Sequence, residues 1–174
     1  MKPMGTDETA STTLVTPLGT LALAASPRGL RRIDFLAPRQ GRRGQRNPAL
    51  PSSPLTREAR QHLARAVGQL REYFAGRRTA FDLPLDLEGT AHQRRVWRAL
   101  LGIPFGRTLS YGALARRLGS PRAARAVGRA CSTNPVPVVV PCHRVVAGNG
   151  ALQGYEGGVW RKRALLELEC SKGR

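Results

Sequence analysis

The side chains best suited to chemistry stand together in the second half of the chain, where Cys142 and His143 follow an apolar run that ends at Pro141. The thiolate is the reactive form of cysteine, and an ordinary thiol, with a pKa of about 8.5, is mostly protonated at neutral pH. A histidine that takes the proton and is itself held by a carboxylate would favour the thiolate, as in a protease triad. A lone cysteine is more often a buried structural residue. Here His143 and Arg144 provide a polar setting, which favours a nucleophile.

Carboxylates that could orient this histidine are scarce. Residues 89–174 contain only Glu156, Glu167 and Glu169 as acidic residues. This scarcity indicates a specific task for at least one of them. A surface ion pair with Arg161 or Arg163 is the alternative.

The cysteine pattern bears on metal binding and redox state. Cys131, Cys142 and Cys170 form no CxxC pair, and no nearby histidine completes a zinc-binding spacing. We therefore expect free thiols in a reducing compartment and no metal. The apolar run at residues 14–25 resembles a signal-peptide core weakly, but two acidic residues precede it, and no stretch reaches membrane-spanning length.

The second half has a helical pattern. Apolar spacing predicts a helix over Gln93–Leu101. Ser110 is a suitable cap for a helix over Tyr111–Leu118, and Ser120 with Pro121 is a suitable start for another over Arg122–Ala130. Two short helices around a tight turn are typical of a helix-turn-helix motif.

The second of these helices is nearly free of bulky side chains. Its small residues are Ala123, Ala124, Ala126, Gly128 and Ala130, and one side carries Arg122, Arg125 and Arg129. Small residues would let the helix approach a minor groove about 6 Å wide. A close-packed helix pair with a solvated arginine stripe is an equally good interpretation of this pattern alone.

The first half predicts a small α/β module without a recognisable site. Strands are expected at Thr12–Val15, Thr20–Ala25, Leu30–Leu36 and Phe81–Leu87, and an amphipathic helix at Leu55–Phe74. Residues 37–54 read as an exposed basic loop, for which simple solvation is favoured over a nucleic-acid arm.

Charge points to an anionic partner. The net charge is +18, with +6 in residues 1–88 and +12 in residues 89–174. Such an excess favours nucleic acid over an acidic membrane surface, bound mainly by the second half. The cations are nearly all arginine, the three lysines being Lys2, Lys162 and Lys172. The sign and location of the charge indicate a nucleic-acid partner more firmly than the predominance of arginine over lysine does.

Three segments together resemble one family. PVPVVVPCHRVV, the upstream SYGALARRLGSPRAARAVGRA and the downstream GYEGGVWRKRALLELE are similar to the O6-alkylguanine-DNA alkyltransferases, in one register from about Gly89 to Glu169. The first half agrees mainly in its order of elements. The resemblance implies a small ribonuclease H-like sheet module over residues 1–86. It also implies a mostly α C-terminal domain over residues 87–174, with a winged-helix-like helix-turn-helix.

The resemblance also implies catalytic roles, position by position. Cys142 aligns with the alkyl-accepting cysteine, His143 with the base that reaches it through a water, and Glu169 with the acid that orients this base. Asn134 matches the hinge asparagine before the active-site segment. Tyr111 matches the tyrosine that donates a proton to guanine N3.

Substrate and DNA contacts follow in the same way. Carbonyls of Cys142 and Val145 would hold the guanine amino group, the Glu156 N–H would donate to O6, and Pro137 and Tyr155 would line the pocket. Cys131 stands where relatives often carry an apolar pocket residue, which would alter the fit of bulkier alkyl groups. Arg125 matches the finger that enters the duplex, and the DNA-facing residues expected beside it are Ala124, Ala126, Gly128 and Ser110.

The implied function is DNA repair by a single, irreversible alkyl transfer from guanine O6 to Cys142 after the base is rotated out of the duplex. The implied partner is double-stranded DNA, approached from the minor groove by a cytoplasmic, nucleoid-associated monomer. No cofactor, metal or membrane is expected, since the zinc ligands of some relatives are absent from the first half. Alkyl-size preference, activity on O4-alkylthymine and cooperativity along DNA stay open.

Three other functions compete with repair. A DNA-binding regulator explains the charge and Arg125 but gives PCHRV no purpose. A lesion sensor that binds without transfer would lack the cysteine. A thiol redox enzyme would need a resolving CxxC pair, which this sequence does not contain.

Overall fold

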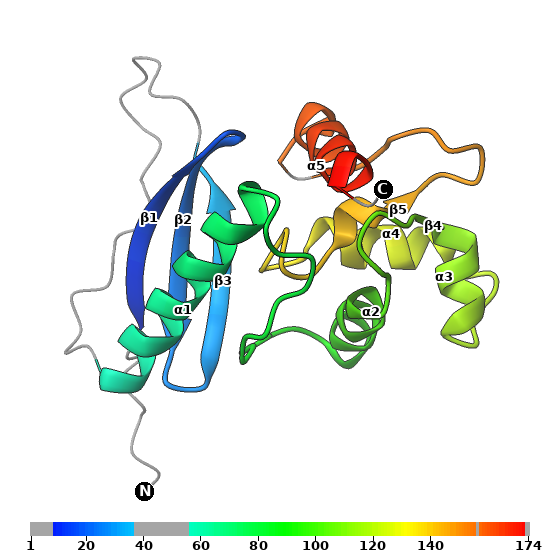
Figure 1. The fold of residues 1–174 in the computed structure, drawn as a ribbon. Helices are drawn as coiled ribbons and strands as arrows, with labels where there is room; N and C mark the ends of the chain where they lie inside the picture. The colour runs from blue at the N-terminus through cyan, green and yellow to red at the C-terminus, as the bar shows by residue number, and fades with distance from the viewer. Residues whose placement is uncertain (1–8, 37–55, 156, 173–174) are drawn as a thin grey trace, which may run out of the picture. The chain divides into compact units, whose positions relative to one another are not determined.

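The computed structural model describes residues 9–36, 56–155 and 157–172. It divides into two compact units, the first ending at Leu87 and the second beginning at Glu88, and each unit is described by itself (Figure 1). The loop predicted at residues 37–54 lies outside the described residues. The description resumes at Thr56, which caps the next helix.

The first unit is a three-stranded antiparallel sheet covered by one helix (Figure 1). The strands are β1 (Ala10–Thr16), β2 (Gly19–Ser26) and β3 (Gly29–Phe35), in that order. Helix α1 (Arg57–Phe74) packs on all three strands and buries residues at helical spacing, among them Leu63, Ala66 and Leu70. The predicted helix and three hairpin-linked strands are present, with ends shifted by at most two residues.

The fourth predicted strand, Phe81–Leu87, is not a strand. Only Leu85 forms a bridge, in parallel with Leu30, with hydrogen bonds from Leu30 N to Pro84 O (2.8 Å) and from Asp86 N to Leu30 O (2.9 Å). Pro84 has no N–H to donate to a ladder, so pairing stops at one bridge. A side chain at position 29 would collide with the Pro84 carbonyl, which explains Gly29 at this close approach.

The second unit is mainly helical. Its helices are α2 (Ala91–Leu101), α3 (Tyr111–Arg117), α4 (Ala124–Ser132) and α5 (Val159–Lys172), with a short 3₁₀ turn η1 (Cys142–Arg144) between the last two. Thr90 and Gln93 form a capping box at the start of α2. Trp97 of α2 is buried and donates from Nε1 to the Ala130 carbonyl of α4 at 2.7 Å, which ties the two helices together.

A two-stranded parallel ladder connects distant parts of this unit. Strand β4 (Leu109–Ser110) leads into α3, and β5 (Val145–Val146) follows η1. Leu109 pairs with Val145 and Ser110 with Val146. The ladder therefore brings the first residue of α3 beside the turn that carries Cys142 and His143.

The start of α4 differs from the prediction. Ser120 does not cap the helix and Pro121 is not its first residue; the Ala123 N–H donates to Ser120 O (2.9 Å), and α4 begins at Ala124 without a side-chain cap. Serine followed by proline also suits the first two positions of a β-turn, and this turn precedes the helix. The predicted end of α3 is confirmed, since Gly119 has a φ of 71° and closes a Schellman motif with Arg116 and Ala115.

Among the residues that the structure describes, no helix has the length and apolar character needed to cross a bilayer.

Candidate active site

The Cys142–Arg144 turn follows a buried, proline-bounded segment. Val136, Val138 and Val140 are fully buried, and Val140 N bonds back to Val136 O at 2.9 Å. Val138 has a φ of 75°, a conformation that a β-branched residue rarely adopts. The surrounding segment therefore holds this backbone in a strained shape that presents Cys142 at its end.

Asn134 joins this segment to the cysteine. Its Nδ2 donates to Val140 O (2.7 Å) and to Cys142 Sγ (3.1 Å), and its Oδ1 accepts from Val136 N (3.0 Å). The bond from Val136 fixes which end of the amide faces the sulfur. A hydrogen bond donated to sulfur favours its ionised form, so Asn134 is placed to hold Cys142 as a thiolate.

His143 is completely buried and bound to Glu169 of α5. Its Nε2 lies 2.8 Å from Glu169 Oε1. An ionised carboxylate only accepts, so Nε2 carries the proton and Nδ1 is the basic nitrogen. Among the described residues Nδ1 has no hydrogen-bond partner. Burial lowers the pKa of His143, while the bond to Glu169 opposes that shift, and the ring is neutral and ready to accept a proton at neutral pH.

Glu169 accepts hydrogen bonds from other groups besides His143. Arg144 donates from Nε to Oε2 (2.9 Å) and from Nη2 to Oε1 (3.0 Å), and the Gly106 N–H donates to Oε2 (3.0 Å). The remaining Arg144 Nη1 binds the Ile103 carbonyl at 2.6 Å. Burial raises the pKa of Glu169, but the bonds from His143 and Arg144 outweigh it and lower that pKa to about 2. The carboxylate is therefore ionised at any physiological pH.

A second polar group surrounds Tyr111, the first residue of α3. Its hydroxyl donates to Gln153 O (3.3 Å), and Lys162 of α5 donates from Nζ to Gln153 O (2.8 Å) and to the Tyr111 hydroxyl (3.4 Å). Burial is the main cause that raises the pKa of Tyr111 to about 12, and negative charge on the Cys131 or Cys142 sulfur, when either is ionised, acts in the same direction. Tyr111 therefore keeps its proton until a strong base is formed beside it.

The predicted pocket residues are placed as follows. Pro137, Val145 and Tyr155 are buried, and Cys131 of α4 is 4% exposed. Burial, and then the charge of Cys142, raise the pKa of Cys131 to about 12, so this thiol stays protonated. Glu156 lies outside the described residues.

The predicted DNA-facing residues lie on or just before α4 and α3. Arg125 and Ala126 are exposed, Ala124 and Gly128 are half-buried, and Ser110 caps α3 by accepting from Ala113 N at 3.1 Å. A side chain on Gly128 would reach the Tyr111 ring at ordinary contact distance. The small-residue helix and the tyrosine are thus neighbours.

Two residues at the site, Arg144 and Lys162, have no individual role predicted from the sequence. Arg144 lies in the PCHRV motif, where the pattern indicates only a polar setting. Lys162 had a usable signal, because Lys162, Leu165 and Glu169 follow the i, i+3, i+7 spacing of one helix face, and all three are fully buried.

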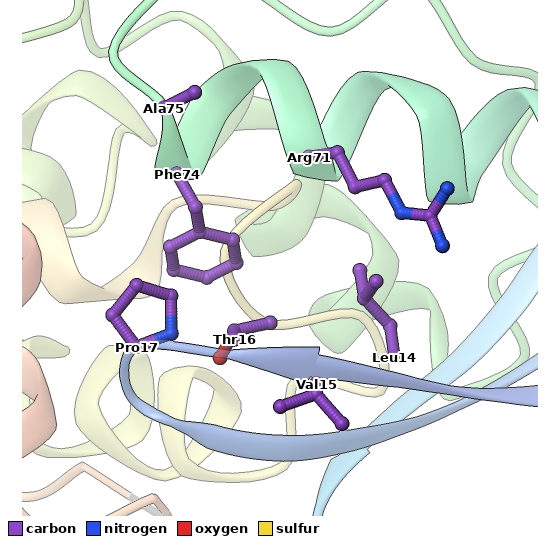
Figure 2. A pocket seen from close by; sticks show the side chains of 7 residues that line it. All are labelled: Leu14, Val15, Thr16, Pro17, Arg71, Phe74 and Ala75. Carbon is purple, nitrogen blue, oxygen red and sulfur yellow. The ribbon is translucent and has the colours of Figure 1, made fainter.

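Neither a metal centre nor the surface pocket of the first unit competes with this site. Among the described residues, no three His, Cys, Asp or Glu side chains gather as a metal site. Figure 2 shows a pocket between the end of β1 and the end of α1, where Phe74 faces Pro17. Its other lining residues are Leu14, Val15, Thr16, Arg71 and Ala75. It holds neither a nucleophile paired with a base nor a carboxylate.

Comparison with known proteins identifies the family. Residues 91–171 match the 6-O-methylguanine DNA methyltransferase, DNA binding domain, and residues 10–87 match the ribonuclease-like domain of the same proteins. A methylated-DNA–protein-cysteine methyltransferase of Methanosarcina acetivorans is 41% identical over 155 residues, which are 89% of this chain and 94% of that protein. The chain belongs to the 6-O-methylguanine DNA methyltransferase family.

Other relatives agree. The protein of the same name from Mycobacterium bovis is 60% identical over 107 residues, 62% of this chain, and this chain covers 65% of its length. A crystal structure of Mycobacterium tuberculosis OGT in complex with DNA has a TM-score of 0.78, 46% identity and 94% coverage of both chains. The two-module fold inferred from the sequence is confirmed by these likenesses.

Proposed function

We propose that this protein repairs DNA by transferring an alkyl group from O6 of guanine in duplex DNA to Cys142, once per molecule. The observation that carries the proposal is the set of contacts around Cys142. Sγ accepts from Asn134, and the next residue is a neutral histidine bound to an ionised Glu169. These residues stand at the positions that the family motifs occupy.

The chemistry balances without a cofactor. His143 Nδ1 takes the thiol proton through a bridging water, and the thiolate attacks the alkyl carbon in line with the C–O6 bond. The S–C bond forms, the C–O6 bond breaks, and its electron pair stays on the purine. The Tyr111 hydroxyl gives a proton to N3, which leaves neutral guanine in the DNA. The thioether has no leaving group, so the protein is consumed.

The target carbon is out of reach inside a base stack, so the nucleotide rotates into the site. Extrusion costs on the order of a few kcal/mol. Arg125 on the exposed side of α4 fills the space in the duplex, and the small residues of α4 let the helix enter the minor groove. Arginine contacts to phosphates offset the rest of the cost of rotating the nucleotide out of the duplex.

We place this monomer in the cytoplasm, at the nucleoid.

Intact mass after incubation with duplex DNA containing O6-methylguanine tests the proposal. We expect the protein to gain one methyl group, mapped to Cys142, and Cys142→Ala to gain none while still binding the duplex. Cys170→Ser, which changes an exposed cysteine, is the matched control and should gain one methyl group. A protein that binds the duplex without a change in mass would instead be a DNA-binding regulator.

A further inference from the structure

Lys162 is a buried cation to which the reaction above gives no task. Its side chain is wholly buried on α5, and within the described part of the chain no carboxylate forms an ion pair with it. Its Nζ donates to Gln153 O and to the Tyr111 hydroxyl, and lies 5.6 Å from the centre of the Tyr111 ring. An unpaired buried charge is costly, so an anion that forms in the site is its natural counterpart.

The titratable groups around Lys162 identify that anion. Tyr111 of α3 is in direct contact with Lys162. Cys131 of α4, and Cys142 and His143 of the active-site turn, interact with its charge electrostatically, and Glu169 and Arg144 bind one another beyond the histidine. Glu169 is already saturated by four hydrogen bonds from other donors. Burial keeps the Cys131 thiol protonated. Cys142 and Tyr111 remain as the groups that can carry negative charge beside Lys162.

Composition supports a specific role for this lysine. The chain has 29 cationic side chains, and only Lys2, Lys162 and Lys172 are lysine. The buried one is thus lysine in a sequence that otherwise uses arginine. A lysine ammonium is a compact point charge, whereas a guanidinium needs a planar space for five donors. The position between Gln153 and Tyr111 suits the smaller group.

We propose that Lys162 is a positioning residue that balances the negative charge moved during alkyl transfer from the sulfur of Cys142 to the oxygen of Tyr111. This inference rests on the proposed function. Before attack the charge is on the thiolate; after Tyr111 protonates the purine it is on the tyrosine oxygen, to which Lys162 Nζ already donates. One ammonium group thus balances the negative charge both before and after transfer, while Glu169 on the same helix face orients His143.

The first test needs no DNA. In a Cys170→Ser background, the rate at which iodoacetamide alkylates Cys142 is followed against pH by mass spectrometry. Lys162→Met, which keeps the length and removes the charge, should raise the midpoint of this profile by about one pH unit or more, since a nearby opposite charge shifts a titration by about 1–3 units. Below the midpoint the rate should fall about tenfold. Arg163→Met, the same change at an exposed neighbour on α5, should leave the profile in place.

A folded Lys162→Met protein whose profile matches the unsubstituted one would overturn the inference. A second measurement avoids the variant. With ¹³C-labelled lysine only three side chains give signals, so Lys162 can be titrated by NMR before and after Cys142 is alkylated. Because the charge of Cys142 raises the pKa of Lys162, alkylation should lower its titration midpoint; an unchanged midpoint would also overturn the inference. Neither result depends on methyl transfer from DNA, so failure of the repair proposal is recognised separately.

Discussion

Glu169 is the residue on which the site depends most. It is fully buried and accepts from His143, twice from Arg144 and from the Gly106 backbone. Removing its charge would leave the Arg144 guanidinium buried without an anion, which is the costly way to break a buried pair. The residue therefore links the chemistry of the base to the stability of the second unit.

Acid titration exposes this link. The folded-state pKa of Glu169 is about 2, below the ordinary value of 4.5. A depressed carboxyl stabilises the fold above its unfolded pKa, and this contribution is lost as pH falls from about 4.5 to about 2. It amounts to at most about 3 kcal/mol. Urea unfolding at several pH values should therefore show a loss over this window that Glu169→Gln does not share.

The variant should also be less stable at pH 7, by about 3 kcal/mol. Glu167→Gln, an exposed acid on the same helix, is the control and should follow the unsubstituted protein throughout. Parallel stability curves for Glu169→Gln and the unsubstituted protein would show that the carboxylate does not carry this energy.

At the scale of elements, α4 has to be a stable helix and also has to leave room for DNA to come close, and these two requirements oppose each other. Its exposed side carries Arg125 and Ala126, while Val127, Ala130 and Cys131 are buried. Gly128 lies between these sides, beside the Tyr111 ring. Glycine inside a helix destabilises it by about 0.5–1 kcal/mol relative to alanine. We expect Gly128 to be present because it lets the helix come close to DNA.

Gly128→Ala separates the two demands. The new methyl group would meet the Tyr111 ring at 3.8 Å, an ordinary contact, so the fold accepts it. We expect the second unit to gain about 0.5–1 kcal/mol in urea unfolding, while affinity for duplex DNA falls several-fold. Gly68→Ala in α1, where nothing lies within 4 Å, should stabilise without a change in affinity. Equal affinity for both variants would refute close approach at Gly128.

The same scale shows what the sequence could reveal. Helical spacing predicted α1, α2 and α3 within a few residues, with Ser110 as the start signal and Gly119 as the stop signal of α3. Ser120 and Pro121 satisfied the rules of a helix start and of a β-turn equally, and only tertiary packing decides between them. The contact of Asn134 with Sγ depends on the fold of the 134–142 segment around a positive φ at Val138, which no local pattern specifies. The contacts of Lys162 with Tyr111 and Gln153 join residues that are far apart in the sequence, so they too depend on the tertiary fold.

For the whole molecule, the distribution of charge is the feature that we expect to govern affinity for duplex DNA. Residues 89–174 carry a net charge of +12 and residues 1–88 only +6. Neutralised phosphates release counterions, and the logarithm of affinity then falls linearly with the logarithm of salt concentration. This dependence reports how many cations face the duplex and from which unit they come.

We expect a steep salt dependence of duplex affinity, measured by fluorescence anisotropy across a range of salt concentrations. Replacing Arg125 by alanine should lower affinity and reduce the slope by about one if this side chain also neutralises a phosphate. Arg60→Ala, an exposed cation of the first unit's helix, is the control and should leave the slope unchanged. A larger effect from Arg60 would place the DNA surface on the first unit.

The placement of Glu169 has a consequence for newly made chains. It lies 26 residues after His143, so a ribosome synthesises the cysteine and its neighbouring histidine well before the acid that holds them in working order. Until α5 docks, His143 lacks the carboxylate that orients it beside Cys142. For the single transfer per molecule that we propose, we expect this order of synthesis to keep the cysteine from reacting before the chain is complete.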